Sequence, residues 1–174
     1  MAEIAAAGIV KRYGGLVAND GVDLSAERGE IHGVMGENGA GKTTLMSILF
    51  GLQAPDAGEI CLRDAPVRFR SPIDAMAAGL GMVHQSFKLF GSLTAWENIV
   101  YGAEPKRGPF IDRRAARERV AELAGRHHLA VDHDARVADL SVGVRQRIEI
   151  LKALHRDARI LILAAGLSVE AIRE

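Results

Sequence analysis

The chain has 174 residues, of which 48% are hydrophobic and 25% are charged, a composition that excludes a disordered protein. Lysine and arginine together number 22, as do aspartate and glutamate, so charge gives no reason to expect a nucleic acid or an anionic lipid as partner. The one cysteine excludes an internal disulfide, and no apolar run reaches the ~18 residues that span a bilayer. Because Met1–Ile4 also lacks the features of a signal peptide, we expect a cytoplasmic chain that reaches a membrane only through a partner.

Residues 4–35 contain short apolar runs separated by turn signals, a pattern that predicts short strands. The turn signals are Gly14-Gly15, Asn19-Asp20-Gly21 and Glu27-Arg28-Gly29. The run Glu30–Met35 is mostly apolar and leads directly into a glycine-rich stretch, so we expect it to form a buried strand.

A helix is predicted to begin near Lys42. Leu45, Ile48 and Leu49 have the spacing of one apolar stripe on that helix, and Gly51 is a stop signal. Further on, residues 58–62 and 66–69 flank a turn and predict a hairpin.

Three later helices have recognisable start signals. Ser71-Pro72 is a favourable helix opening, and a short buried strand is expected over residues 80–84. Thr94 and Glu97 have capping-box spacing, and Asp112 and Ser141 are expected to cap two longer helices.

The stretch Arg159–Leu163 reads as a strand that is buried on both faces. Alternating strands and helices indicate an α/β fold, in which the mostly helical stretch 92–155 forms a separate lobe.

The strongest motif is GENGAGKT at residues 36–43, which matches G-x-x-x-x-G-K-[ST] completely. Glycines allow successive backbone N–H groups to face phosphate oxygens, and the helix that follows adds its positive N-terminal end. Lys42 supplies a charge for the β- and γ-phosphates, and the Thr43 hydroxyl is suited to Mg²⁺. The pattern arises by chance in roughly 1% of chains of this length, so we predict nucleotide-phosphate binding.

The run Leu140–Arg147, LSVGVRQR, resembles the signature sequence of ATP-binding-cassette (ABC) transporters. In that family it closes over a nucleotide held by a second cassette, which implies roles for Ser141, Gly143 and Gln146. Taken alone, the same residues are equally consistent with a serine-capped amphipathic helix.

Two further segments resemble the same family. Gly81–Gln85 is similar to the strand and glutamine of the Q-loop, which implies that Gln85 contacts Mg²⁺ and the attacking water. Tyr13 matches the aromatic residue that stacks on adenine. The alternatives are a surface glutamine and a tyrosine packed in a sheet. The family order of all four segments favours the resemblance, which covers about residues 4–163.

The resemblance implies a P-loop NTPase fold with a RecA-like core, an antiparallel β subdomain and a helical subdomain. Residues 1–91 and 156–163 would form the core and β subdomain, residues 92–155 the helical subdomain, and residues 164–174 a tail outside the family pattern. The implied cofactors are ATP and Mg²⁺, with Lys42 and Gln85 catalytic and Thr43 and Gln85 on the metal. The full set expected to contact the nucleotide is Tyr13, Gly36, Glu37, Asn38, Gly39, Ala40, Gly41, Lys42, Thr43, Thr44, Gln85, Ser141, Gly143 and Gln146.

The implied function is that of an energy-coupling ATPase subunit of an importer, peripheral on the inner face of the cell membrane. Its partners would be transmembrane permease subunits, a second cassette placed head to tail and, indirectly, a substrate-binding protein, with no nucleic acid. Phrases such as VANDGVDL (17–24) and GMVHQ (81–85) resemble importers of nucleosides or simple sugars, with nucleosides favoured. Residues 85–101, including Trp96, are the expected contact with the membrane subunit. A non-transport ABC ATPase acting on DNA or ribosomes is the less favoured alternative.

The chain departs from the family at the end of Arg159–Leu163, where an aspartate and a glutamate normally follow. Ala164-Ala165 stands there, and the residues after it resemble nothing in the family. We therefore expect that this chain alone does not hydrolyse ATP at a family-like rate, and a catalytically inactive fragment that at most binds nucleotide is the alternative function. We also expect unpaired strand edges and a chain of low stability.

Overall fold

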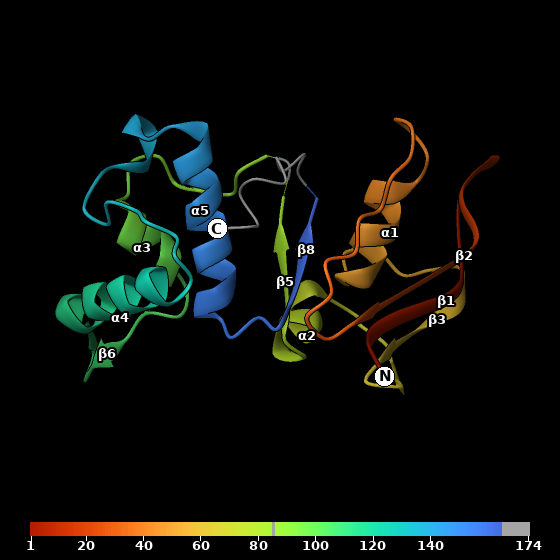
Figure 1. Cartoon of the computed structure of the whole chain (residues 1–174), viewed down its shortest axis with the longest axis horizontal. Coiled ribbons are helices and arrows are strands. Elements are labelled where there is room, and N and C mark those ends of the chain that lie inside the picture. The colour runs from red at the N-terminus through yellow and green to blue at the C-terminus, as the bar shows by residue number, and fades with distance from the viewer. Residues whose placement is uncertain (85, 165–174) are drawn as a thin grey trace. The chain divides into compact units, whose positions relative to one another are not determined.

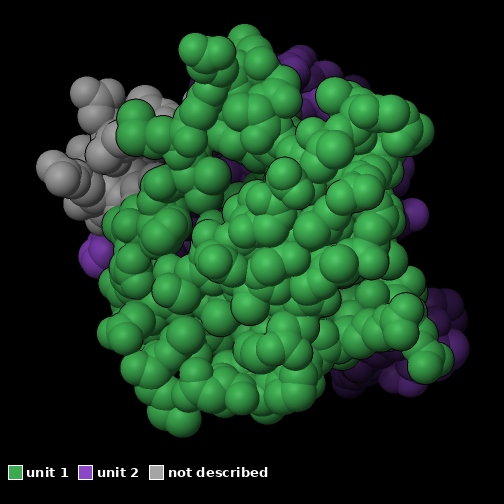
Figure 2. Space-filling view, turned by 90° about the vertical axis from the view of Figure 1, so that its right-hand side faces the viewer, with its two compact units in different colours: residues 1–80 green, residues 81–174 purple. Residues whose placement is uncertain are grey.

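The computed structural model describes residues 1–84 and 86–164. The chain divides into two compact units, residues 1–80 (unit 1) and residues 81–174 (unit 2), which are coloured separately in Figure 2. Among the described residues, no helix is both long enough and apolar enough to cross a bilayer.

Unit 1 is built on a four-stranded antiparallel sheet with the order β2-β1-β3-β4 (Figure 1). Its strands are β1 (Ala2–Tyr13), β2 (Leu16–Glu27), β3 (Ala57–Leu62) and β4 (Ala65–Val67). The predicted hairpin is confirmed, because β3 pairs with β4 around a turn whose residues Arg63 and Asp64 both have positive φ. The first two strands are longer than the short runs that the sequence predicts.

Two helices belong to unit 1. α1 (Lys42–Leu49) contacts both β1 and β2, and α2 (Pro72–Ala77) begins with a complete capping box between Ser71 and Asp74. The predicted start of α1 and its apolar stripe are confirmed. The buried apolar residues of this unit are Ile4, Ala6, Ile9, Leu45, Ile48, Leu49, Phe50, Ile60, Leu62, Ala75 and Leu80.

The turn predicted at Asn19-Asp20-Gly21 is wrong, because these residues lie inside β2. Ile9 pairs with Val22 and Lys11 pairs with Asn19, so β2 has one extra residue between these pairs. Gly21 has a φ of 65°, a conformation that glycine adopts readily. The turn residues therefore form a β-bulge, in which the strand continues instead of reversing.

The strand predicted over Glu30–Met35 is also wrong. Residues 30–37 have no regular secondary structure, and Ile31 and Met35 are 71% and 95% exposed. A strand needs a hydrogen-bonded neighbour, and in the described part of the chain these residues pair with none.

Unit 2 combines two short two-stranded sheets with helices. β5 (Leu80–Val83) pairs with β8 (Ile160–Leu163), and β6 (Lys106–Arg107) pairs with β7 (Phe110–Ile111). The prediction that the last strand is buried on both faces is wrong: only Ile162 of β8 is buried, since β5 is its one described neighbour.

Three helices form the core of unit 2: α3 (Ala95–Val100), α4 (Arg113–Arg126) and α5 (Val142–His155), which lie together in Figure 1. A short 3-10 helix, η1 (Val137–Asp139), precedes α5. The predicted caps at Thr94 and Asp112 are confirmed. The buried apolar residues at the centre of this core are Ala95, Trp96, Ile99, Val100, Ala116, Val120, Ala124, Val137, Ile148 and Leu151.

Candidate functional site

The glycine-rich loop at residues 36–43 lies in unit 1, directly before α1. Residues 36–40 are exposed, and the Ala40 amide donates to the Glu37 carbonyl at 3.2 Å, which closes a turn. Gly39 and Gly41 have φ values of 86° and 81°, in the left-handed region that disfavours other residues. The backbone therefore turns sharply at two glycines, in conformations that other residues rarely adopt.

Gly41 is the one position in this loop where a side chain has no room. A Cβ built there would lie 2.0 Å from the Ala18 carbonyl oxygen of β2, whereas one built at Gly39 would meet nothing within 4 Å. The neighbouring Asn19, 5% exposed, donates from Nδ2 to the Gly41 carbonyl at 3.3 Å. The bulged strand β2 thus sets the position of the loop through Ala18 and Asn19.

The Lys42 ammonium lies inside the curve of the loop. Its Nζ donates to the carbonyl oxygens of Gly36 at 2.5 Å and Glu37 at 2.7 Å. These bonds hold the charge against two carbonyl oxygens of the loop. The arrangement brings together the lysine and the glycines that the motif predicts.

The start of α1 is open to a ligand. Its N-cap residue is Gly41, no side chain caps it, and no acidic residue occupies the first turn. The partial positive charge of the helix end is therefore not neutralised from within the helix. The Thr43 side chain is exposed at this end, whereas Thr44 is half-buried.

Tyr13 lies at the end of β1 with 45% of its surface exposed. Its hydroxyl donates to Gln53 Oε1, and the Lys11 ammonium lies 5.8 Å from the ring centroid. Lys11 also donates to Asp56 at 3.0 Å, and together with the Arg12 amide this bond holds the pKa of Asp56 below its usual value. The ring is thus held in place while part of it stays accessible, as stacking on a base requires.

The segment that resembles the ABC signature forms the start of α5 in unit 2. Ser141 is the N-cap residue, but its side chain makes no capping hydrogen bond, so the prediction that its hydroxyl caps this helix is wrong. Ser141 and Gly143 are exposed and Gln146 is half-buried. The first turn contains no acidic residue. This helix end therefore presents a hydroxyl and unneutralised backbone amides.

The chain immediately before α5 is held by side chains and backbone. Arg145 donates to the carbonyl oxygens of Val137 at 3.1 Å and Ala138 at 2.7 Å, so α5 fixes the segment from which it starts. The Val137 amide also donates to the Leu93 carbonyl at 3.1 Å. Ser141 is therefore positioned by its own helix and by the residues before α3.

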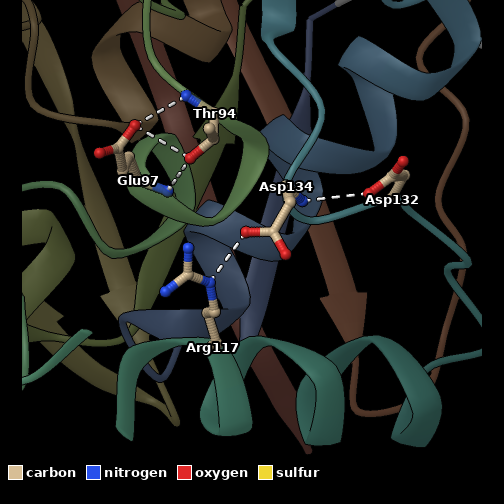
Figure 3. A network of polar contacts seen from close by, with 5 residues as sticks. All are labelled: Thr94, Glu97, Arg117, Asp132 and Asp134. Atoms are coloured by element: carbon tan, nitrogen blue, oxygen red, sulfur yellow. Dashed lines mark hydrogen bonds and ion pairs between the residues drawn. The ribbon is translucent and has the colours of Figure 1, made fainter. Parts of the chain in front are cut away.

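Figure 3 shows how the loop that contains Asp132 and Asp134, which precedes η1 and α5, is held near α3 and α4. The Thr94 hydroxyl and amide bind Glu97, the Asp134 amide donates to Asp132, and Arg117 of α4 donates to Asp134 at 2.8 Å. Asp134 and Arg117 are 59% and 44% exposed, so the ion pair contributes at most about 1 kcal/mol. Its role is to fix a loop, and most of the stability comes from the apolar core beside it.

The expectation that Trp96 contacts a membrane partner is wrong. Trp96 is only 4% exposed and belongs to the core of unit 2. The Arg117 guanidinium lies 4.9 Å from its ring centroid and covers the ring further. The exposed aromatic residues nearby are Phe90 and Tyr101, whose ring centroids are 4.8 Å apart.

Two expected sites fall on or beside undescribed residues. Gln85, expected to contact Mg²⁺, lies outside the described residues, as do Ala165 and the rest of the tail. Ala164 is described, and its amide donates to the Val83 carbonyl at 3.0 Å. Among described residues, no group of three histidine, cysteine or acidic side chains gathers. Of the two residues expected at Mg²⁺, only Thr43 is described, and its exposed hydroxyl would suit an ion that usually keeps several waters and takes phosphate oxygens as ligands.

Several supporting residues are not indicated by the motifs. Gln53 accepts a hydrogen bond from Tyr13, and Asn19 donates one to the carbonyl of Gly41 in the loop. The residues that flank Gln53 and Asn19 in the sequence do not predict either bond. The one local clue to Asn19 is its place in a polar triplet, which instead indicates a turn. Arg145 lies within the signature pattern, so its importance could have been inferred from there, but not the carbonyl groups that it binds.

Comparison with known proteins agrees with this geometry. The ABC transporter family model matches residues 19–164. The chain is 49% identical over 154 residues to the guanosine import ATP-binding protein NupO of Bacillus subtilis, covering 88% of this chain and 30% of that protein. It is 46% identical to the glucose import ATP-binding protein TsgD13 of Haloferax volcanii, covering 89% of this chain and 33% of that protein. The chain thus spans about a third of the length of these relatives.

A solved structure shows the same fold. A nucleotide-free ATP-binding cassette from an ABC transporter aligns with a TM-score of 0.83 at 23% identity, covering 99% of this chain and 73% of that one. The fold that the resemblance to ABC transporters implies is therefore confirmed. With the family match over most of its length, the chain belongs to the ABC transporter family.

Proposed function

We propose that this chain binds the phosphates of ATP through residues 36–43 and acts as part of the energy-coupling ATPase of an importer. The observation that supports this most directly is the loop itself. Two glycines with positive φ, a lysine inside the curve and a helix start without an acidic residue converge on one exposed point. Such a point suits a multiply charged phosphate chain.

Different residues bind different parts of the magnesium–ATP complex in this proposal. The loop amides and Lys42 hold the phosphates, Thr43 holds Mg²⁺ together with phosphate oxygens and water, and the half-exposed Tyr13 ring stacks on adenine. When bound, ATP would supply the phosphoryl group that water attacks, and Mg²⁺ would neutralise the charge on its oxygens. Gln85 is the proposed contact to that water and to the metal.

A second cassette completes the site in this proposal. Ser141, Gly143 and Gln146 close over a nucleotide held by another cassette placed head to tail, as a symmetric pair of such interfaces allows. The uncapped Ser141 hydroxyl favours this role, because no hydrogen bond within its own helix occupies it. Backbone amides at the start of α5 add donors for the same phosphate.

The transported substrate is proposed to be a nucleoside or a simple sugar. Similar proteins are named for guanosine import and for glucose import, at 49% and 46% identity. We favour a nucleoside. Uptake of labelled guanosine or of labelled glucose, by cells that carry the protein at its natural length, distinguishes a nucleoside importer from a sugar importer. If neither compound is taken up, both proposals are wrong.

The proposed partners are permease subunits at the inner face of the membrane and, through them, a substrate-binding protein. Phe90 and Tyr101 replace Trp96 as the proposed contact, since both are close to half-exposed and their tilted rings contact each other. Phe90→Asp should abolish uptake while leaving ATP binding intact. Phe110→Asp, which changes another exposed aromatic residue, is the matched control.

A fragment that binds nucleotide without hydrolysing it is the second candidate. Ala164 follows β8, and its methyl group has no oxygen with which to orient Mg²⁺ or water. Lys42→Ala decides between the two functions. If the unsubstituted chain releases phosphate from ATP and Lys42→Ala abolishes that release, the fragment hypothesis is wrong.

Titration with a fluorescent ATP analogue tests the binding proposal itself. Lys42→Ala should weaken binding at least about tenfold, because it removes a charged donor to the phosphates. Lys106→Ala, which changes an exposed lysine of β6, should leave the affinity unchanged. Equal affinities for the Lys42→Ala variant and the unsubstituted protein would contradict the proposal.

A further inference from the structure

Among the residues that the structure describes, the segment at residues 88–90 pairs with no strand, yet the backbone N–H and C=O groups of Lys88 and Phe90 are all hydrogen-bonded. The Lys88 amide donates to Glu149 Oε1 at 2.8 Å, and the Lys88 carbonyl accepts from Lys152 Nζ at 2.9 Å. The Phe90 amide donates to Asn98 Oδ1 at 2.8 Å, and the Phe90 carbonyl accepts from Asn98 Nδ2 at 3.0 Å. Side chains thus supply the bonds that a neighbouring strand would supply to alternate residues.

The side chains that make these bonds are themselves buried in unit 2. Asn98 is 0% exposed and Glu149 is 4% exposed, and Lys152 is half-buried. Buried polar groups are costly unless they are paired, so these side chains strongly favour the backbone position that satisfies them. Leu89, between the two bonded residues, packs against the apolar core that α3 and α5 share.

Three charged side chains of α5 and its C-terminal end act on one another near this contact. Lys152 lies one turn beyond Glu149 on α5, and burial lowers the pKa of Lys152 although the charge of Glu149 raises it. The nearby Arg156 charge also lowers the pKa of Lys152. The ammonium is therefore held in a poorly solvated place, where its bond to the Lys88 carbonyl replaces water.

We infer that Glu149, Lys152 and Asn98 are positioning residues that lock residues 88–90 onto α5 and α3, so that this segment and α5 move as one body. Bonds to a neighbouring strand would tie these residues to a sheet. Bonds to helix side chains instead tie residues 88–90 to α5, the helix that begins at Ser141. Phe90, one of these residues, also contacts the exposed Tyr101 ring. If the Ser141 end of α5 is displaced, the Phe90–Tyr101 pair is then displaced with it.

The inference rests on the proposed function in one respect only: that Ser141 contacts a nucleotide and Phe90 contacts a permease subunit. Its physical part concerns hydrogen bonds alone and is tested separately by amide hydrogen exchange at Lys88. Glu149→Ala removes the acceptor of this amide and should speed its exchange about tenfold or more, as expected for loss of one bond to a charged acceptor. Glu149→Gln keeps an acceptor oxygen and should restore most of the protection.

The functional part is tested in the protein at its natural length, reconstituted with its permease in liposomes. Glu149→Ala and Lys152→Met should lower the substrate transported per ATP hydrolysed at least about fivefold, while binding of the fluorescent ATP analogue stays unchanged. Glu149→Gln should recover the ratio. Glu122→Gln, which changes an exposed glutamate of α4 paired with Arg126, is the matched control and should match the unsubstituted protein.

Each outcome has a defined meaning. Unchanged Lys88 exchange in Glu149→Ala overturns the inference, as does faster exchange with an unchanged transport ratio in both variants. If Glu149→Ala does not fold, Lys152→Met carries the test through the transport ratio, because its apolar stem remains. If the unsubstituted protein binds no ATP, the proposed function fails, whereas the exchange experiment still reports on the hydrogen bonds.

Discussion

The loop at residues 36–43 and the segment at residues 88–90 are both irregular, but they are held in opposite ways. The loop is exposed, and its shape depends on backbone conformations that glycine permits and on a lysine from its own sequence. The segment is fixed by the buried side chains of two helices: Asn98 of α3, 8 positions from Phe90, and Glu149 of α5, 61 positions from Lys88. A site made of local sequence can be recognised as a motif, whereas a site made by distant side chains is visible only after folding.

Gly41→Ala should break the loop most severely. The added methyl would lie 2.0 Å from the Ala18 carbonyl oxygen at a φ of 81°, so strain and overpacking together should cost about 3–5 kcal/mol in the free energy of unfolding. Binding of the ATP analogue should be lost. Urea denaturation and the binding titration measure these effects.

Gly39→Ala is the control for the same loop. Its φ of 86° is equally unfavourable, but its methyl would meet nothing within 4 Å. We expect a loss of only about 1–2 kcal/mol. If both substitutions cost the same, the contact with Ala18 does not define the loop.

Ile148→Ala tests the buried region on which the segment at residues 88–90 depends. Ile148 of α5 is 0% exposed, so truncation should leave a cavity and cost about 2–4 kcal/mol. Ile111→Ala, at a residue that is 51% exposed, should change the free energy of unfolding by less than about 0.5 kcal/mol. Urea denaturation measures both, and similar values for the two variants would contradict the placement of Ile148 in the core.

Thr94→Ala and Ser141→Ala compare two N-cap residues of unit 2. Thr94 accepts from the Glu97 amide, so its loss should cost about 1 kcal/mol. Ser141 makes no capping bond, so its loss should cost less than about 0.5 kcal/mol. Thermal unfolding checks both values. A large destabilisation by Ser141→Ala would show that its hydroxyl serves α5 rather than a ligand.

Acidification should give the smallest effect, at Asp56 near Tyr13. The Lys11 side chain and the Arg12 amide lower the pKa of Asp56 in the folded chain below its ordinary value. The stabilising contribution is therefore present above the ordinary pKa and is lost as the pH falls through the lowered one. NMR titration of the Asp56 carboxyl measures this pKa, which Lys11→Met should raise towards the ordinary value.

The features predicted correctly from the sequence are those with local causes. Capping by Ser71, Thr94 and Asp112 depends on residues within one helical turn, and the phosphate loop depends on eight consecutive residues. Such signals do not require knowledge of the rest of the fold.

Apart from the Ser141 cap, which is a local signal, the errors arise where the outcome depends on distant neighbours. Residues 30–35 have the composition of a strand but no described partner, and the polar triplet at residues 19–21 became a bulge because β1 continues beside it. Trp96 has the amphipathic character of an interface residue, yet helix packing buries it. Glu149 contacts a residue 61 positions away, a relation that no local pattern contains.

The position of Lys42 has a consequence for how a ligand is captured. Two of the three N–H donors of its ammonium are already directed at carbonyl oxygens of the loop, so a phosphate gains this lysine by exchange rather than by simple addition. Only a ligand with concentrated negative charge competes well against two neutral carbonyls. The loop should therefore not bind uncharged solutes, such as free sugars and nucleosides, even at concentrations far above that of the nucleotide.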